Sequence, residues 1–295
     1  YDVNGKRYLD GVSSLWVTVH GHRHPRIDSA IRSQLRRVAH TTFLGLSHPP
    51  AIDLAGRLVG IAPRGLTRVF YSDNGSTAVE VALKMAFQHW RQRGEKHRTR
   101  FLSFRNSYHG DTIGSVSVGG IGLFHGVFRP LLFDALFAES PYCWRCPAKK
   151  SYPACGIECL GSAESLMRKR RREIAAVVVE PLVQAAAGML VYPSEFLRGL
   201  RDLCTKHGIL LIADEVATGF GRTGAMFACE KAGVSPDLMA LAKGITGGYL
   251  PLAATLGTSA MYGSFKGRHE EFRAFFQGHT QTARPLACLS AEASL

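Results

Sequence analysis

An aspartate and a lysine, each next to a short apolar run, are the side chains in this sequence best placed to do chemistry. Asp214 follows five apolar residues, 209–213, which have the length of a buried strand. In open α/β sheets, ligands bind beyond the carboxyl ends of the strands, which is where Asp214 would lie. Lys243 follows the apolar run 238–242. Apolar surroundings lower the pKa of an amine, so Lys243 is a candidate Schiff-base nucleophile. Each residue alone also has a plainer interpretation, as a helix cap or loop aspartate and as a solvated lysine.

A turn of small and polar residues, 72–77, precedes a helix predicted over 78–91. Backbone N–H groups at the start of a helix lack partners and carry the positive end of its dipole, so they favour an anion. Gly75 lets an anion approach the backbone, and Ser76 and Thr77 add hydroxyl groups. The turn is therefore a candidate phosphate site, and the alternative is an ordinary helix cap.

Four cysteines lie close together in the sequence, with the spacing C-x2-C-x8-C-x3-C, at Cys143, Cys146, Cys155 and Cys159. Four thiolates at short spacing can form a tetrahedral zinc site. The alternative is four reduced thiols in a surface excursion over residues 140–161. A zinc site of this kind would be structural, because four thiolates leave no open position for a substrate.

The order of these parts resembles that of the class III aminotransferases, which use pyridoxal 5′-phosphate (PLP). The matching segments cover nearly the whole chain and include residues 214–216, the glycine-rich residues 218–224, Pro236-Asp237 and Lys243-Gly244. The resemblance implies that Asp214 pairs with the pyridine nitrogen of PLP. It also implies that Lys243 forms the Schiff base and then removes the substrate proton.

The same resemblance assigns further cofactor contacts. Gly75, Ser76 and Thr77 would form the phosphate cup, and Thr280 would reach the phosphate of a partner chain, which makes the active unit a homodimer. Tyr108 would cover one face of the ring, although it could also be a half-buried loop tyrosine. The remaining predicted contacts are His109, beside Tyr108, and Val216, which lies two residues past Asp214 and so on the same side of an extended chain.

The substrate side is implied by residues 11–25, which resemble the substrate-pocket segment of the biotin-pathway branch of this family. Trp16 stands in that segment, but Leu15 replaces a second tryptophan. Tyr108, Asp111 and Gly278 are the other predicted substrate contacts, and Asp111 could instead cap a turn. The resemblance implies transfer of an amino group to 8-amino-7-oxononanoate, with adenosylmethionine or lysine as donor. Another ω-aminotransferase, acting on a diamine or ω-amino acid, is the alternative.

Two other classes of protein are weighed against an aminotransferase. A PLP-fold protein could bind without catalysis, but Lys243 and Asp214 are both present. A zinc-dependent interaction module could be built on the four cysteines, but it would not need the other motifs. Two departures from the family pattern are the alanines 185–187, where a more glycine-rich turn is usual, and Arg284 before Pro285.

Recurring strands separated by helical patterns predict an α/β fold with a largely parallel sheet. The predicted strands are 69–71, 101–104, 174–179, 209–213 and 253–256, and the predicted helices are 26–39, 78–91, 162–167 and 193–207. Asn4-Gly5 predicts a hairpin over residues 1–10, and Gly208 predicts a helix C-cap. The family resemblance implies PLP-dependent transferase fold type I. Residues 1–13 would belong to a smaller domain that is only partly present, and residues 14–295 to the large domain.

Composition limits the possible partners. The net charge is +13, but the densest basic run, 168–172, has the character of a solvated helix end, so no nucleic-acid partner is predicted. No apolar run approaches the roughly 18 residues of a membrane span, and no signal peptide is recognisable. Seven cysteines, an odd number, indicate reduced thiols and a cytoplasmic setting. The chain has the appearance of a fragment truncated at both ends.

Overall fold

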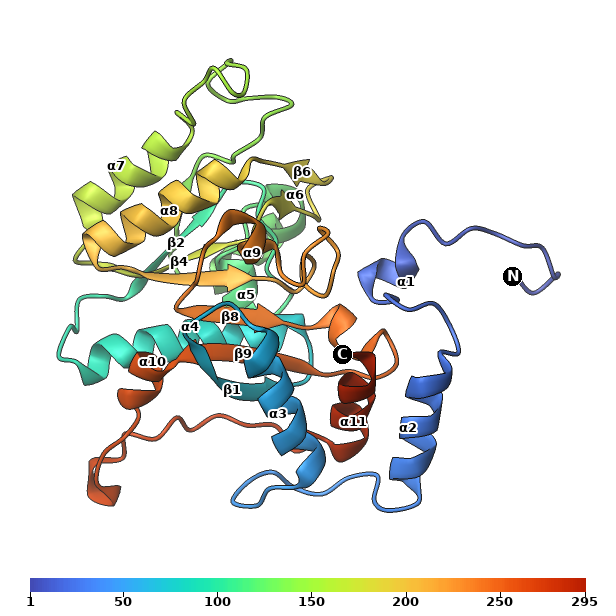
Figure 1. Cartoon of the computed structure of the whole chain (residues 1–295). Coiled ribbons are helices and arrows are strands. Elements are labelled where there is room, and N and C mark those ends of the chain that lie inside the picture. The colour runs from blue at the N-terminus through green and yellow to red at the C-terminus, as the bar shows by residue number, and fades with distance from the viewer.

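A seven-stranded sheet forms the centre of the computed structural model, which describes residues 1–295 (Figure 1). The strands lie in the order β1-β9-β8-β7-β4-β2-β3. Their bounds are β1 Leu66–Ser72, β2 Arg100–Phe104, β3 Leu136–Ala138, β4 Ile174–Val179, β7 Leu210–Asp214, β8 Leu238–Leu241 and β9 Ala253–Thr258. All neighbouring pairs are parallel except the two that involve β9. A separate two-stranded ribbon pairs β5 (Val183–Gln184) with β6 (Leu190–Val191).

Helices cover both faces of this sheet, because its central strands are apolar on both sides. Alternate residues of β7 show this, since Leu211 and Ala213 belong to one core cluster and Ile212 to another. The first cluster contains side chains of α3 (Pro49–Ile61), α7 (Leu160–Arg170), α8 (Ser194–His207) and α11 (Pro285–Ser294). The second is covered by α4 (Gly75–Gln92) and α10 (Ser259–Gly263).

The remaining helices are short or lie toward the chain ends. They are α1 Ser13–Trp16, α2 Pro25–Leu35, α5 Ile113–Ser117, α6 Gly122–His125 and α9 Ala228–Ala232, with the 3-10 segments η1 Gly126–Leu131, η2 Lys243–Thr246 and η3 His269–Glu271. α2 and α11 pack against each other although they come from opposite ends of the chain (Figure 1). No helix combines the length and the apolar character needed to cross a membrane.

The predicted α/β fold with a mostly parallel sheet is confirmed, and every predicted strand outside residues 1–10 is present. Gly208 ends α8 in the left-handed conformation, with a φ of 59°, as its position after the helix predicts. The helix predicted over 26–39 ends earlier, at Leu35. The division into two domains at residue 13 stays a prediction.

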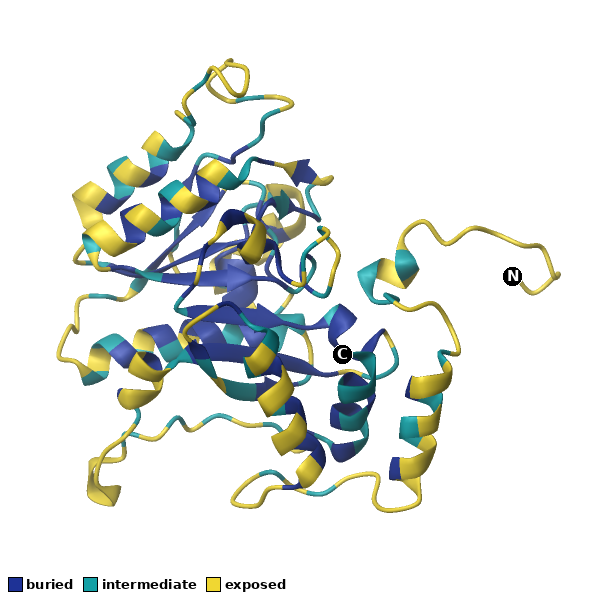
Figure 2. Cartoon of the chain, viewed as in Figure 1, coloured by how far each residue is buried: buried dark blue, intermediate teal, exposed yellow.

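The hairpin predicted over residues 1–10 is wrong. A turn forms, in which the Asp2 N–H donates to the Lys6 carbonyl, but no strands flank it. All ten residues are exposed, as the yellow N-terminal stretch in Figure 2 shows. A two-stranded hairpin without an apolar surface to cover is only marginally stable, which explains why the turn signal alone does not produce strands.

Candidate active site

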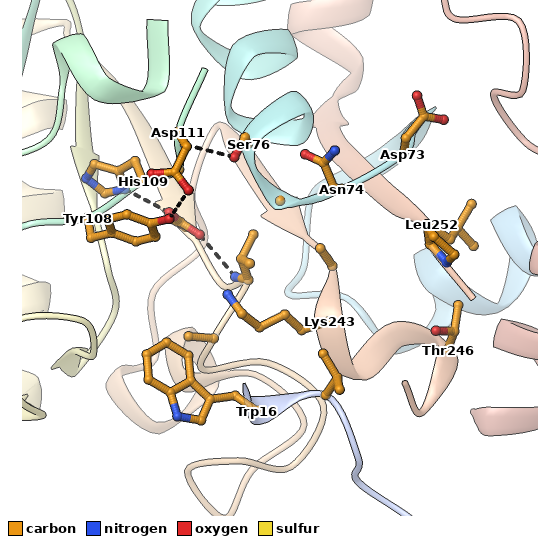
Figure 3. A pocket seen from close by; sticks show the side chains of 18 of the residues that line it. Trp16, Asp73, Asn74, Ser76, Tyr108, His109, Asp111, Lys243, Thr246 and Leu252 are labelled. Atoms are coloured by element: carbon orange, nitrogen blue, oxygen red, sulfur yellow. Dashed lines mark hydrogen bonds and ion pairs between the residues drawn. The ribbon is translucent and has the colours of Figure 1, made fainter. Parts of the chain in front are cut away.

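A cavity of about 640 Å³ opens at the carboxyl edge of the sheet (Figure 3). Parallel strands end at the same edge, so polar residues that follow β2, β4, β7 and β8 converge there. The lining comprises Trp16, Val17, Asp73–Ser76, Tyr108–Thr112, Glu180, Ala186, Asp214, Val216, Ala217, Ala242, Lys243, Thr246 and Gly248–Leu252. The predicted site residues Asp214, Lys243, Tyr108, His109 and Val216 are therefore brought together in one cavity.

Asp214 is held firmly at the end of β7 and is only 5% exposed. Its Oδ2 lies 2.7 Å from Nδ1 of the buried His109, and its Oδ1 accepts the Val216 N–H at 3.1 Å. These contacts fix the carboxylate from two sides. A fixed, buried carboxylate beside a cavity is suited to hold a ligand N–H or a positive charge.

Lys243 begins η2 and lies in the same cavity, half-buried. Burial lowers the pKa of its amine, while the negative charges of Asp214 and Glu180 oppose that shift. The amine lies 5.3 Å from the centre of the Trp16 ring. In Figure 3 the Lys243 side chain points into the space between Trp16 and Tyr108. A lowered pKa increases the neutral, nucleophilic fraction of the amine at physiological pH.

The turn before α4 lines the cavity through Gly75 and Ser76 but not through Thr77. The Thr77 hydroxyl accepts the Asn74 N–H at 3.0 Å, and the Asn74 side chain accepts the Thr77 N–H at the same distance. This capping box uses both polar groups of Thr77. A Cβ at Gly75 would lie 2.6 Å from a Val216 methyl, so this position needs glycine. Within this chain Thr77 serves the helix cap, and its contact with a phosphate stays a prediction.

Tyr108 is held by three groups. Its hydroxyl donates to Asp111 at 2.7 Å, and its backbone N–H donates to Glu180 at 2.9 Å. Its ring stacks at 17° on His125, with ring centres 6.2 Å apart. Burial, then the hydrogen bond to Asp111, raises the pKa of the Tyr108 hydroxyl, so it stays protonated and acts as a donor.

The N-terminal turn brings Trp16 to the cavity in an unusual backbone conformation. Residues 13–16 all have positive φ values, between 49° and 67°. Such a left-handed turn costs roughly 1–2 kcal/mol per residue. Arg222 holds it, because its guanidinium donates to the Ser13 hydroxyl at 3.4 Å and to the Trp16 carbonyl at 3.2 Å.

Gly278 and Thr280 do not line the cavity of their own chain, and both are exposed. Between them, His279 Nδ1 lies 2.5 Å from Asp73 Oδ2. Since Asp73 does line the cavity, this contact keeps the segment close to the cavity rim. The role of Gly278 in substrate binding stays a prediction.

Glu180, which lines the cavity, and His125, which stacks on Tyr108 without lining the cavity, are two residues to which the sequence analysis assigned no role. Glu180 lines the cavity and is 5% exposed. Its pKa is raised to about 7, mainly by burial, with His109 lowering it and Asp214 raising it. A signal was present, because Glu180 directly follows a buried strand just as Asp214 does. His125 carried no comparable signal.

The four clustered cysteines lie in a segment without regular secondary structure, unlike the cavity residues that follow the strands. Residues 139–159 contain no helix or strand. All four thiols are free and line one hollow of about 10 Å³. Burial raises the pKa of Cys143, and raises that of Cys159 to about 11, with the neighbouring cysteines adding to both shifts. No three ligand-type side chains are grouped closely enough to hold a metal ion.

Comparison with known proteins identifies the family. The model of the aminotransferase class III family matches residues 1–295. The chain belongs to the class III aminotransferases. A similar protein is the adenosylmethionine-8-amino-7-oxononanoate aminotransferase of Nitratidesulfovibrio vulgaris. The sequence identity is 64%, and the match covers the whole of this chain and 55% of that protein. This chain is 58% identical to the protein of the same name from Geobacter sulfurreducens, again over its whole length and over 65% of that protein.

Solved structures agree with this family assignment. The adenosylmethionine-8-amino-7-oxononanoate aminotransferase of Methanocaldococcus jannaschii matches with a TM-score of 0.93 and 45% identity, over 99% of this chain and 65% of that one. A PLP-bound amine transaminase from an uncultivated Pseudomonas species matches with a TM-score of 0.95 and 42% identity, over 99% and 67%. The chain thus spans about half to two thirds of the length of these relatives.

Proposed function

We propose that this chain provides the PLP site of an enzyme that converts 8-amino-7-oxononanoate to 7,8-diaminononanoate in biotin biosynthesis. The observation that carries the proposal is the pairing, in one cavity, of the buried Asp214 with Lys243, whose pKa is lowered. The names of the relatives from Nitratidesulfovibrio and Geobacter support the substrate. Adenosylmethionine or lysine would be the amino donor.

The residues present fit PLP. Lys243 would hold it covalently through its amine, and Asp214 would accept a hydrogen bond from the ring nitrogen. Gly75 and Ser76 would hold the phosphate at the start of α4, where backbone N–H groups favour an anion. Tyr108 and Val216, which line the same cavity, are available for the two faces of the ring. When bound, PLP supplies an electron sink for the carbanion formed at the substrate.

The protein's own groups then have three tasks. The Lys243 amine takes the substrate proton at Nζ, which its lowered pKa favours by keeping a neutral fraction. Asp214 stays in place, because His109 and the Val216 N–H hold its two oxygens. Trp16, fixed by Arg222, lines the cavity beside Lys243 and is available as an apolar wall for the substrate.

The experiment is an assay of the full-length protein with 8-amino-7-oxononanoate and separate amino donors. We expect formation of 7,8-diaminononanoate with adenosylmethionine or with lysine. The second candidate is another ω-aminotransferase activity, which the match to the Pseudomonas amine transaminase favours. Consumption of a diamine or ω-amino acid, with none of 8-amino-7-oxononanoate, would support that candidate and contradict the first.

We also propose that the active unit is a homodimer in the cytoplasm. The segment 121–133 exposes large apolar side chains, among them Leu123 at 91% and Val127 at 80%, which a second copy could cover. Thr280 is exposed and outside its own cavity, where it is available to a partner's site. All seven cysteines are free, as expected for a reducing compartment.

A mixed dimer tests the role of Thr280. One chain carries Thr280→Ala and the other carries Lys243→Ala. If Thr280 acts on the partner's site, the chain with Lys243→Ala provides an intact Thr280 to the one site that still has Lys243. We expect PLP affinity near wild type at that site. Affinity as weak as in the Thr280→Ala homodimer would mean that Thr280 acts within its own chain.

A further inference from the structure

A second buried carboxylate lies beside Asp214. β4 and β7 are parallel neighbours, and their register pairs Val179 with Ala213. The next residues along the two strands are Glu180 and Asp214, so both carboxylates stand at the same level of the sheet edge. Both line the cavity and both are 5% exposed. The proposed transamination assigns a role to Asp214 but none to Glu180.

The hydrogen bonds of Glu180 indicate what its role is. Its Oε1 accepts the Tyr108 N–H and its Oε2 accepts the Ala185 N–H, each at 2.9 Å. The carboxylate thus ties the loop after β2 to the turn between β5 and β6. Backbone donors occupy both of its oxygens, so this carboxylate holds the protein's own backbone rather than a substrate. Its own carbonyl is also fixed, by the Tyr192 hydroxyl at 2.6 Å.

Glu180 holds the loop that carries Tyr108 and His109, the part of the site that would face the PLP ring. Tyr108 is one of the two side chains available to cover the ring, and the next residue, His109, is the partner of Asp214. Neither Tyr108 nor His109 lies in a helix or strand, so no regular backbone ladder fixes them. Ala185 and Ala186 belong to the alanine turn after Gln184, and Ala186 also lines the cavity.

We propose that Glu180 is a positioning residue, which fixes Tyr108 and His109 relative to Asp214 by clamping the Tyr108 backbone to the turn after β5. The part of this inference that concerns the ring rests on the proposed PLP function. The clamp itself is a property of the protein alone, so the two can be tested separately.

Glu180→Gln is the test variant, because an amide has nearly the same shape but only one acceptor for two N–H donors. Glu215→Gln is the matched control. Glu215 is also fully buried and also accepts two backbone N–H groups, those of Ala228 and Cys229, but it does not line the cavity. Both variants lose a buried carboxylate that accepts two backbone N–H groups, and Glu215 also accepts the Thr218 hydroxyl, so a general loss of stability affects both.

The first measurement is hydrogen exchange in the cofactor-free chain. We expect peptides that contain Tyr108 or Ala185 to exchange about tenfold faster in Glu180→Gln, and only peptides around Ala228 to do so in Glu215→Gln. Unchanged exchange at both Tyr108 and Ala185 would overturn the proposal. If Glu180→Gln does not fold, Glu180→Asp takes its place. Aspartate keeps the carboxyl group but is one methylene shorter, so its oxygens lie farther from the two N–H donors.

The second measurement is visible circular dichroism after loading with PLP. We expect Glu180→Gln to bind PLP, as judged by absorbance, but to lose dichroic intensity, because the ring is less firmly oriented. Glu215→Gln should match wild type. An equal change in both variants would show that Glu180 acts only through stability and would overturn the positioning role. A wild-type chain that binds no PLP would instead contradict the proposed function. The hydrogen-exchange experiment would still test whether Glu180 holds Tyr108 and Ala185, because it needs no PLP.

Discussion

The cavity at the sheet edge and the cysteine excursion both gather reactive side chains, but only the cavity gives them fixed partners. Asp214, His109 and Lys243 come from parts of the chain that are far apart, yet Asp214 and His109 lie 2.7 Å from each other. The four cysteines come from one short segment, yet no three of them are arranged to hold an ion. Closeness in the sequence is therefore a poorer guide to fixed side-chain geometry than attachment to neighbouring strands.

The physical reason is the number of interactions that fix each backbone. β4, β7 and β8 are parallel neighbours with defined registers, and their side chains are almost all buried. Residues 139–159 have only local turns and a few anchors, such as the Glu139 N–H donating to Ser162 at 2.9 Å. The most direct ways to test this comparison are substitutions in the two regions.

Lys243→Ala should have the largest effect. Loss of the amine removes both covalent attachment and the proton acceptor, so we expect transamination to fall by about 10⁴-fold or more. Borohydride reduction of the PLP-loaded wild type, followed by peptide mapping, should place the label on Lys243. A label on Lys84 or Lys231 would contradict the assignment.

Asp214→Asn should leave PLP bound but lower the rate by roughly 10²–10³-fold, because an amide cannot keep the ring nitrogen protonated. Asp214 raises the pKa of Lys243, so its removal should lower that pKa further below its ordinary value. The neutral amine would then persist to lower pH. The pH dependence of Lys243 acetylation in cofactor-free protein measures this shift, and half-reaction rates near wild type would refute the role of Asp214.

His109→Asn should have a smaller effect, about tenfold on the rate, because it weakens the orientation of Asp214 without removing the carboxylate. Single-turnover kinetics with the amino donor measure the loss. His89→Asn is the control for the loss of a buried histidine, because His89 bonds to Ser264 and does not line the cavity. A His109→Asn loss as large as that of Asp214→Asn would mean that His109 itself acts on the ligand.

The double change Cys143→Ser and Cys146→Ser should have the smallest effect and leave the half-reaction within about twofold of wild type, because the excursion lies outside the cavity. The zinc site predicted from the spacing stays a prediction. Metal analysis of protein purified without chelator tests it, and one zinc per chain would support it. A folded double variant that binds PLP but cannot transaminate would show a direct catalytic role.

The predictable parts of the molecule were those encoded locally. The strands and their terminal Asp214, the apolar setting of Lys243 and the cap of α8 at Gly208 are all visible in short windows. The position of Glu180 beside Asp214 is not visible in this way, because it depends on the register between β4 and β7. The hold of Arg222 on Trp16 joins residues more than 200 positions apart, and no local pattern indicates it.

The place of β9 in the sheet has a consequence for how the protein is made. β1 pairs with no strand other than β9, and residues 73–252 separate the two. During synthesis β1 therefore leaves the ribosome and waits roughly 10–40 seconds for its partner, at about 5–20 residues per second. For that time an apolar strand edge is open to pairing with other chains. We expect nascent chains that stop before residue 253 to bind chaperones strongly, and release to follow the insertion of β9.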